Sequence, residues 1–369
     1  MPQIPKKVNL TQNSADIINA IRNDTELKHL PEVSADDTAT IRTFGQAVLS
    51  SQVNSNVFLD ALVNRIGKVV ITSKLYENPW AMLKKGFLEF GETVEEIFVS
   101  IAKPHNYDPL KAETELYKRE KPDVKTAFHM LNFQKFYQAT VQEEDLRQAF
   151  LSWSGITDLI GRIIDQLVTA SNLDELLVMK HIVATKYLAD KISKVDVAEI
   201  NKSTSSDLVT TIKEYSNNLT YMDTSYNEEG VLTKSDKQDQ YLIMSSKVDA
   251  NVDVNVLAIS FNMEKAEFAG HRTPINNFSF NDFELARLKE LLGEEQVTYT
   301  SEQLEKLKKI HVILMDSDWF MVFDNMNKMN QVYNEQGLYW NHYYHVWKIF
   351  SSSPFANAVA FAIPEPTEV

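Results

Sequence analysis

Apolar and polar positions alternate along two stretches between residues 91 and 145, which predicts two paired β-strands. The first strand runs from Glu92 to Lys103 and the second from Phe128 to Val141. Side chains two residues apart share one face of a strand. The positions expected to share a face are Glu95, Ile97, Val99 and Ile101 on the first strand, and Leu131, Phe133, Tyr137 and Ala139 on the second. The pattern therefore predicts a long β-hairpin.

The segment that joins the two strands is long and charged. Residues 103–125 contain Pro104, Pro109 and Pro122, no glycine, and six basic against five acidic side chains. Such a loop is unusual inside a compact domain, and an isolated hairpin is at best marginally stable in water. One interpretation is a loose surface insertion. We favour an extended flap that docks on a neighbouring subunit, because that subunit would supply the apolar contacts that the hairpin lacks.

Residues 145–192 carry apolar side chains at three- and four-residue steps, the spacing of one face of an α-helix. Gly155, Gly161 and the Ser171-Asn172 pair interrupt this pattern with residues of lower helix propensity. We therefore expect a long helical rod that bends or breaks, with a break and a new N-cap at Ser171.

The remaining pattern predicts an α+β fold. Residues 201–309 are expected to form a mixed α/β subdomain, with a helix over 207–217, a buried strand over 240–244, a helix over 246–261, an Asn-rich loop that holds Phe278, Phe280 and Phe283, and a charged helix that ends at Lys309. The C-terminal part is expected to begin with a buried strand over 310–315. Asp316–Asp318 would then cap a helix through Trp319, Val322, Phe323 and Met326. An aromatic strand over 338–350 and an apolar strand over 355–363 are expected to follow.

The first 55 residues are more polar. Asn13 to Asp16 can cap a short helix through Ile17, Ile18 and Ile21, and a polar run follows to Thr43. Such a segment has too little apolar surface to hold itself in place, so we expect an arm that lies along something else.

Composition narrows the classes of function. The 369 residues are 44% hydrophobic and 24% charged, as in a folded soluble protein. Ten glycines fall below the usual share of about 7%, which disfavours phosphate-binding loops, and the lack of cysteine excludes disulfides and thiolate zinc sites. The N-terminus shows no apolar signal segment, so we expect a soluble, intracellular product. With 37 basic and 51 acidic residues the net charge is −14, whereas proteins that read nucleic-acid sequence usually carry a basic surplus.

Two features suggest chemistry. Asp316-Ser317-Asp318 follows a predicted strand and resembles the Asp-x-Asp motif of magnesium-dependent phosphotransferases, but we favour a helix N-cap with an acidic first turn. His342 and His345 lie three positions apart on a predicted strand, which places their rings on opposite faces and disfavours a shared metal. The aromatic strand around them is also an alternative base-stacking platform, but only Lys348 lies within it.

The order of the parts and several local motifs resemble a known family. The motifs are Asp36 to Gly45, Tyr241 to Met244, Asp316 to Asn325, Gly337 to Asn341, His345 to Trp347 and Ser353 to Phe361. They are similar to the major head proteins of small short-tailed phages of the phi-29-like group, which have the Hong Kong 97-type capsid fold.

The resemblance implies a domain order. It assigns 1–55 to the N-arm, 56–90 to the lead into the P-domain, 91–145 to the E-loop hairpin, 146–200 to the P-domain spine helix, 201–309 to the A-domain and 310–369 to the return into the P-domain sheet.

The resemblance also implies a structural protein with no catalytic residue, cofactor or metal. Copies would assemble into hexamers and pentamers of an icosahedral head around double-stranded DNA, formed in the host cytoplasm with portal and scaffolding proteins and without a membrane. The expected E-loop contacts between subunits are Ile97, Val99, Ile101, Lys118, Arg119, Glu120, Lys121, Phe133 and Tyr137. We find no match for the Lys–Asn pair and glutamate that cross-link the type member of the fold. The alternatives are a phosphotransferase that uses Asp316 and Asp318, and an adaptor that forms small oligomers.

Overall fold

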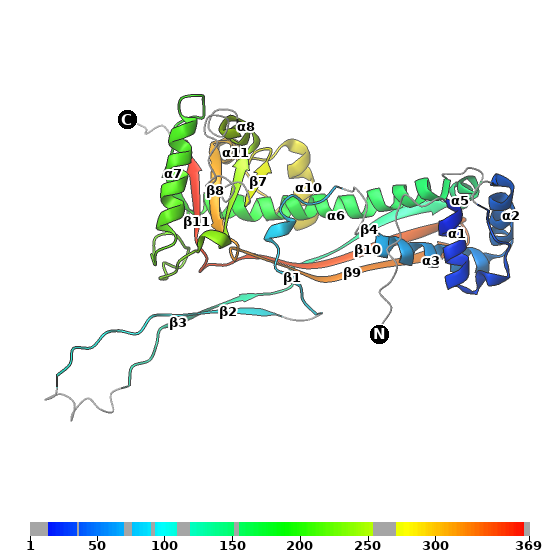
Figure 1. Cartoon of the computed structure of the whole chain (residues 1–369), viewed down its shortest axis with the longest axis horizontal. Coiled ribbons are helices and arrows are strands. Elements are labelled where there is room, and N and C mark those ends of the chain that lie inside the picture. The colour runs from blue at the N-terminus through cyan, green and yellow to red at the C-terminus, as the bar shows by residue number, and fades with distance from the viewer. Residues whose placement is uncertain are drawn as a thin grey trace. The chain divides into compact units, whose positions relative to one another are not determined.

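The computed structural model describes residues 14–34, 37–69, 76–89, 93–108, 119–150, 155–253 and 271–364. The chain divides into two compact units, each built from segments that are distant in sequence. The first unit contains Met1–Asn78, Phe133–Glu175 and Asp324–Trp347, and the second contains Pro79–Asn132, Leu176–Phe323 and Lys348–Val369. Helices and strands occur in both, which confirms the expected α+β class (Figure 1).

Helices and one sheet make the first unit. Its helices are α1 (Ser14–Asp24), the 3-10 helix η1 (Glu26–His29), α2 (Thr38–Leu49), α3 (Gln52–Val69), α5 (Glu143–Ala149) and the first part of α6 (Gly155–Leu188). Strands β9 (Phe320–Asn334) and β10 (Tyr339–Ser352) pair with each other, and β4 (Phe133–Gln142) pairs with β10. Strand β1 (Gly86–Phe87), from the second unit, pairs with the start of β9 through the Lys85 amide and the Val322 carbonyl, 2.9 Å apart.

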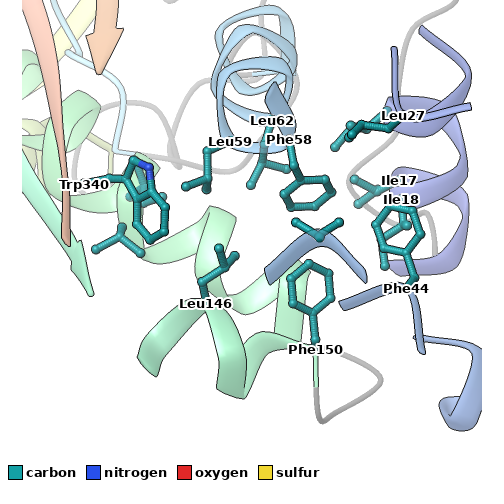
Figure 2. Packing of buried hydrophobic residues seen from close by; sticks show 14 of the residues in the cluster. Ile17, Ile18, Leu27, Phe44, Phe58, Leu59, Leu62, Leu146, Phe150 and Trp340 are labelled. Atoms are coloured by element: carbon teal, nitrogen blue, oxygen red, sulfur yellow. The ribbon is translucent and has the colours of Figure 1, made fainter. Parts of the chain in front are cut away.

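The core of the first unit includes the N-terminal helices (Figure 2). The rings of Phe44 on α2, Phe58 on α3 and Phe150 after α5 pack together, with centroids 5.4–6.2 Å apart. Ile17 and Ile18 on α1 are almost completely buried in the same cluster. The expectation that this segment lacks enough apolar surface to hold itself in place is therefore wrong for the described residues, because short helices place its few apolar side chains on one face.

Helix α6 runs without a break through Ser171, so the predicted break there is wrong. Helix α5 ends at Ala149 and α6 begins at Gly155. Serine and asparagine cost a helix less than about 1 kcal/mol each, and burial of the side chains on either side outweighs that cost. Leu167 and Leu177, which flank the site, are each only 1% exposed.

The second unit contains a five-stranded sheet in the order β5-β11-β8-β6-β7. Its strands are β5 (Ser193–Asp196), β6 (Gln240–Ser245), β7 (Arg272–Ile275), β8 (Ile310–Asp316) and β11 (Ala358–Ala362). Helices α7 (Ser205–Asn218) and α8 (Ser246–Val252) cover one face and share an apolar cluster with it. Every residue of β8 and β11 is buried, which explains why their sequences are almost entirely apolar.

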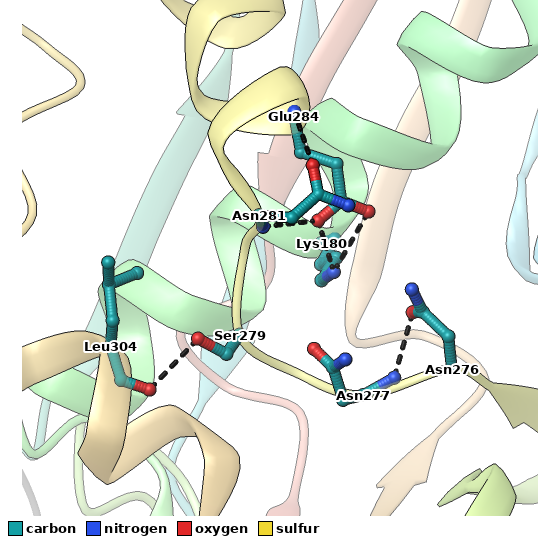
Figure 3. Close-up of polar contacts among 7 residues, drawn as sticks. All are labelled: Lys180, Asn276, Asn277, Ser279, Asn281, Glu284 and Leu304. Carbon is teal, nitrogen blue, oxygen red and sulfur yellow. Dashed lines mark hydrogen bonds and ion pairs between the residues drawn. The ribbon is translucent and has the colours of Figure 1, made fainter.

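A buried ion pair joins α6 to α10 (Asp282–Leu292), a helix that the sequence pattern did not predict (Figure 3). Lys180 Nζ lies 3.2 and 3.3 Å from the two carboxylate oxygens of Glu284 and 4.7 Å from the centre of the Phe280 ring. The Glu284 carboxylate also accepts a hydrogen bond from the Asn281 amide, while Asn281 Oδ1 accepts one from the Glu284 amide. Burial lowers the pKa of Lys180, and Glu284 opposes that shift. Asn281 and Glu284 form a capping box that starts α10.

The predicted helix after Asp316 is wrong, because the chain makes a turn there and enters β9. The Asp316 carboxylate accepts a hydrogen bond from the Asp318 amide at 2.8 Å, and its carbonyl accepts one from Trp319 at 3.0 Å. Apolar residues at 319, 322, 323 and 326 imitate a helical spacing, but both faces of the first part of β9 are buried, so no strict alternation is needed.

The predicted hairpin is present, but its second strand begins and ends earlier than expected. Strand β2 (Val94–Val99) pairs with β3 (Val124–His129), and a separate strand, β4, follows from Phe133. Asn132 marks the division, since its side chain donates to the Phe350 carbonyl at 2.7 Å and accepts from the Phe350 amide at 2.9 Å. The predicted second strand thus combines parts of two strands that belong to different sheets.

Candidate interaction surface on the hairpin

The register of the hairpin gives it two different faces. The antiparallel pairs Glu95–Phe128, Ile97–Thr126 and Val99–Val124 lie on one face, and the pairs Val94–His129, Glu96–Ala127 and Phe98–Lys125 lie on the other. Exposure alternates along β2 with the same period of two. One face is therefore open to solvent, whereas the other is partly covered.

The open face is mainly apolar. Ile97, Val99 and Ile101 are 57%, 53% and 62% exposed, and Val124 and Phe128 are 48% and 60% exposed. We call these five side chains the apolar hairpin face. Single exposed apolar residues are common, but a contiguous patch usually marks an interaction site. The sequence pattern identified Ile97, Val99 and Ile101, and it missed Val124 and Phe128 because the second strand was placed too late in the chain.

The covered face contacts the body of the second unit. The Phe98 and Phe355 rings lie 5.9 Å apart, and Lys125 Nζ donates to the Glu229 carbonyl at 2.9 Å and lies 3.1 Å from its carboxylate. A polar cluster of Glu96, His129, Ser351 and Ser353 lies beside these contacts. The covered face thus anchors the hairpin and leaves the apolar hairpin face open.

The loop beyond the paired strands is only partly described. The Ser100 amide donates to the Asp123 carbonyl at 2.9 Å, and His105 and Glu120 approach to 2.9 Å. Arg119 and Lys121 are exposed, as expected of contact residues. Lys118, also expected to contact a neighbour, lies outside the described residues.

Two expected contact residues lie elsewhere. Phe133 and Tyr137 belong to β4 in the first unit, where they are 3% and 9% exposed. The Tyr137 hydroxyl donates to the Asp174 carboxylate at 2.8 Å. These two side chains are therefore part of the chain's own core and not of an exposed hairpin surface, which corrects the prediction.

The Asp-x-Asp motif has the surroundings of a structural turn. Burial raises the pKa of Asp316, while hydrogen bonds from Ser235 and the Asp318 amide oppose that shift. The Asp318 side chain is 70% exposed and pairs with Lys85. Within the described residues, no three His, Asp or Glu side chains are grouped in a way that would hold a metal ion.

His342 and His345 lie on opposite faces of β10, as the strand period requires. The His345 and Phe136 rings contact each other in a tilted arrangement, with centroids 5.8 Å apart. His342 is 1% exposed, and neither ring nitrogen has a hydrogen-bond partner among the described residues. Burial lowers its pKa to about 4.

The buried His342 ring predicts destabilisation by acid. Because its pKa is about 4 in the folded chain and 6.5 ordinarily, the unfolded chain binds more protons between these values. Stability therefore falls as the pH drops from 6.5 to 4, by about 3 kcal/mol for this one group. We expect His342→Phe to reduce the pH slope of the unfolding free energy in denaturant titrations. His181, whose pKa is also about 4, should keep part of the slope. An unchanged slope in the variant would contradict the assignment.

The fold and the open hairpin can now be compared with known proteins. The capsid structure of Staphylococcus phage Andhra matches with a TM-score of 0.60 at 15% identity, over 80% of this chain and 86% of that one. The capsid structure of the cyanophage P-SCSP1u matches with a TM-score of 0.54 at 11% identity, over 80% and 90%. The fold of this chain is thus the Hong Kong 97-like fold of these phage capsid structures.

Sequence comparison gives the family. The model of the family described as "Phi29-like phage major capsid protein" matches residues 18–362. The major capsid protein of Bacillus phage B103 is 36% identical over 367 residues, which cover 96% of this chain and 75% of that protein. That of Streptococcus phage Cp-1 is 26% identical over 360 residues, which cover 94% and 93%. The chain belongs to the Phi29-like phage major capsid protein family.

Membership of this family decides between the alternatives. The chain is a structural component of the phage virion and associates with copies of itself in the capsid. A phosphotransferase that uses Asp316 and Asp318 has no support among its relatives, which are structural capsid proteins. Among the described residues, no helix is both long and apolar enough to cross a bilayer.

Proposed function

We propose that this chain forms hexamers and pentamers of an icosahedral head around double-stranded DNA, and that the apolar hairpin face binds a neighbouring copy. The observation that carries the proposal is the exposure of about half or more of Ile97, Val99, Ile101, Val124 and Phe128 in the single chain. Burial of apolar surface contributes roughly 25 cal/mol per Å². A modest contact, repeated at every subunit, can therefore hold a shell together.

The same proposal extends to partners and domains. Portal and scaffolding proteins are proposed partners, assembly is placed in the host cytoplasm, and contact with packaged DNA is non-specific. The net charge of −14 supports non-specific rather than sequence-reading contact, because it offers no basic surplus for phosphates. We keep the proposed order of N-arm, E-loop, spine helix and A-domain, but end the E-loop before Phe133, where the first unit resumes.

Deletion of residues 104–122 tests the role of the hairpin loop. A short Gly-Ser turn would join Lys103 to Asp123, so that β2 and β3 can still pair. We expect a folded, soluble chain that no longer forms closed shells in electron micrographs, because the loop's contacts with a neighbour are lost. Circular dichroism serves as the control for folding. Normal particles from the deletion variant would contradict the proposed role.

A further inference from the structure

The hairpin is tied to the rest of the second unit at residues 351–355, which comprise the end of β10 and the first residues after it. Ser351 and Ser353 of this segment contact polar side chains from both strands of the hairpin, and Phe355 contacts the Phe98 ring. The next anchor, Glu229, is itself bound to this segment, because its amide donates to the Pro354 carbonyl at 3.1 Å. Side chains from both strands of the hairpin, β2 and β3, thus contact the same region of the second unit.

Four side chains form a continuous series of hydrogen bonds at this point. The Ser353 hydroxyl donates to Glu96 Oε1 at 2.6 Å, Glu96 Oε2 lies 3.2 Å from His129 Nε2, and His129 Nδ1 lies 2.8 Å from the Ser351 hydroxyl. We call these four residues the clasp. Glu96 comes from β2 and His129 from β3, so both strands of the hairpin are held.

His129 and Ser353 of the clasp are buried, Glu96 and Ser351 are partly exposed, and hydrogen bonds hold the segment around Ser353 in place. His129 is 2% and Ser353 is 1% exposed. The Ser353 amide donates to the Trp319 carbonyl at 2.8 Å, and the Ser353 hydroxyl accepts from the amides of Phe355 and Ala356 at 3.1 Å each. Ser351, His129 and Glu96 follow one another in the order of a hydrolase triad. Because the His129 ring is buried and Glu96 is also bonded to the Ser353 hydroxyl, we interpret the series as a structural tie.

Hydrogen bonds restrict direction in a way that apolar contacts do not. Their strength falls steeply when the donor angle departs from linearity, whereas apolar burial depends on area and is non-directional. A buried polar network that is fully bonded therefore specifies one arrangement of the parts that it joins. The clasp joins both strands of the hairpin to a segment that leads directly into β11 of the central sheet.

We propose that the clasp sets the angle at which the hairpin leaves the second unit, and through that angle the curvature of the shell. Glu96, His129, Ser351 and Ser353 are positioning residues, because they act through the apolar hairpin face and do not themselves reach the neighbour. This inference rests on the proposed binding of that face to a second copy. A looser clasp lets the same apolar contact form over a range of angles, and the assembled particles then vary in size.

The test compares particles that the full chain forms with Glu96→Ala, Glu96→Gln and Ser351→Ala. Glutamine keeps an oxygen that accepts from Ser353, so Glu96→Gln should restore the wild-type particles. Ser351→Ala removes one hydroxyl at a partly exposed position and provides a second variant if Glu96→Ala does not fold. Glu305→Ala on α11 (Ser301–Lys308) removes a 63% exposed carboxylate of the same unit and serves as a matched control.

We expect Glu96→Ala and Ser351→Ala to assemble into particles with a broadened and shifted distribution of diameters in electron micrographs. Hydrogen exchange of the β2 and β3 amides should also be faster in these variants. Wild-type diameters for both variants would overturn the inference, and so would complete loss of assembly by folded protein. A different result would contradict the proposed function itself, namely normal assembly of variants in which the apolar hairpin face carries charged residues.

Discussion

The double variant Ile97→Lys with Val99→Lys should remain folded and soluble but form no closed shells. Both side chains are more than half exposed in the single chain, so lysine fits there without loss of core packing. In the assembled shell the same positions would be covered, and an unpaired buried charge costs several kcal/mol. Each 1.4 kcal/mol lowers an association constant about tenfold. Sedimentation velocity should show slowly sedimenting, unassembled subunits in place of large particles.

A matched control keeps the apolar area. Ile97→Val with Val99→Ile exchanges the two side chains and preserves their combined volume and their preference for strands. It should assemble as the wild type does. Closed shells from the lysine variant, in the same yield as from this control, would show that the apolar hairpin face is not an interface.

The second large effect concerns the buried ion pair of Lys180. Lys180→Met should lower the free energy of unfolding by about 3 kcal/mol, because it leaves the Glu284 carboxylate without its cation. The Lys180 side chain is 2% exposed and that of Glu284 is 14% exposed, so water compensates little. Denaturant titration under conditions that keep the chain unassembled measures the difference.

The double variant Lys180→Met with Glu284→Gln separates the effect of the unpaired Glu284 charge from the effect of losing the helix cap. Glutamine can still accept from the Asn281 amide and so preserve the start of α10. We therefore expect the double variant to be more stable than Lys180→Met alone. A double variant that is less stable than Lys180→Met would contradict this explanation, as would a Lys180→Met variant as stable as the wild type.

The central strands of the fold were predictable from the sequence. The runs predicted over 310–315, 338–350 and 355–363 correspond to β8, β10 and β11 within a few residues. Strands β8 and β11 were visible because strands buried on both faces need apolar residues at nearly every position. The short strand over 240–244 was found for the same reason and forms β6. Strand β10 is only partly buried and was visible from its run of aromatic side chains.

The errors arose where two structures fit one local pattern. After Asp316, apolar spacing suited a helix, but pairing with β10, the next strand, makes β9 a strand. At Ser171, local propensity suggested a break that tertiary packing along α6 overcomes. Helix α10 was missed, although Asn281 and Glu284 have the spacing of a capping box.

The candidate surface was predicted in part. Alternation along β2 identified Ile97, Val99 and Ile101 as one face, and the structure leaves that face exposed. Phe133 and Tyr137 follow the same alternation, but the strand is interrupted at 130–132 and they belong to β4, in a different sheet. The clasp was not predictable, because Ser351 and Ser353 lie more than two hundred residues from their partners.

One measurement tests the central claim directly: a density map of the assembled particle at a resolution that shows side chains. We predict that Ile97, Val99 and Phe128 of each copy are covered by apolar side chains of a neighbouring copy. A closed shell in which these three side chains face solvent would contradict the account.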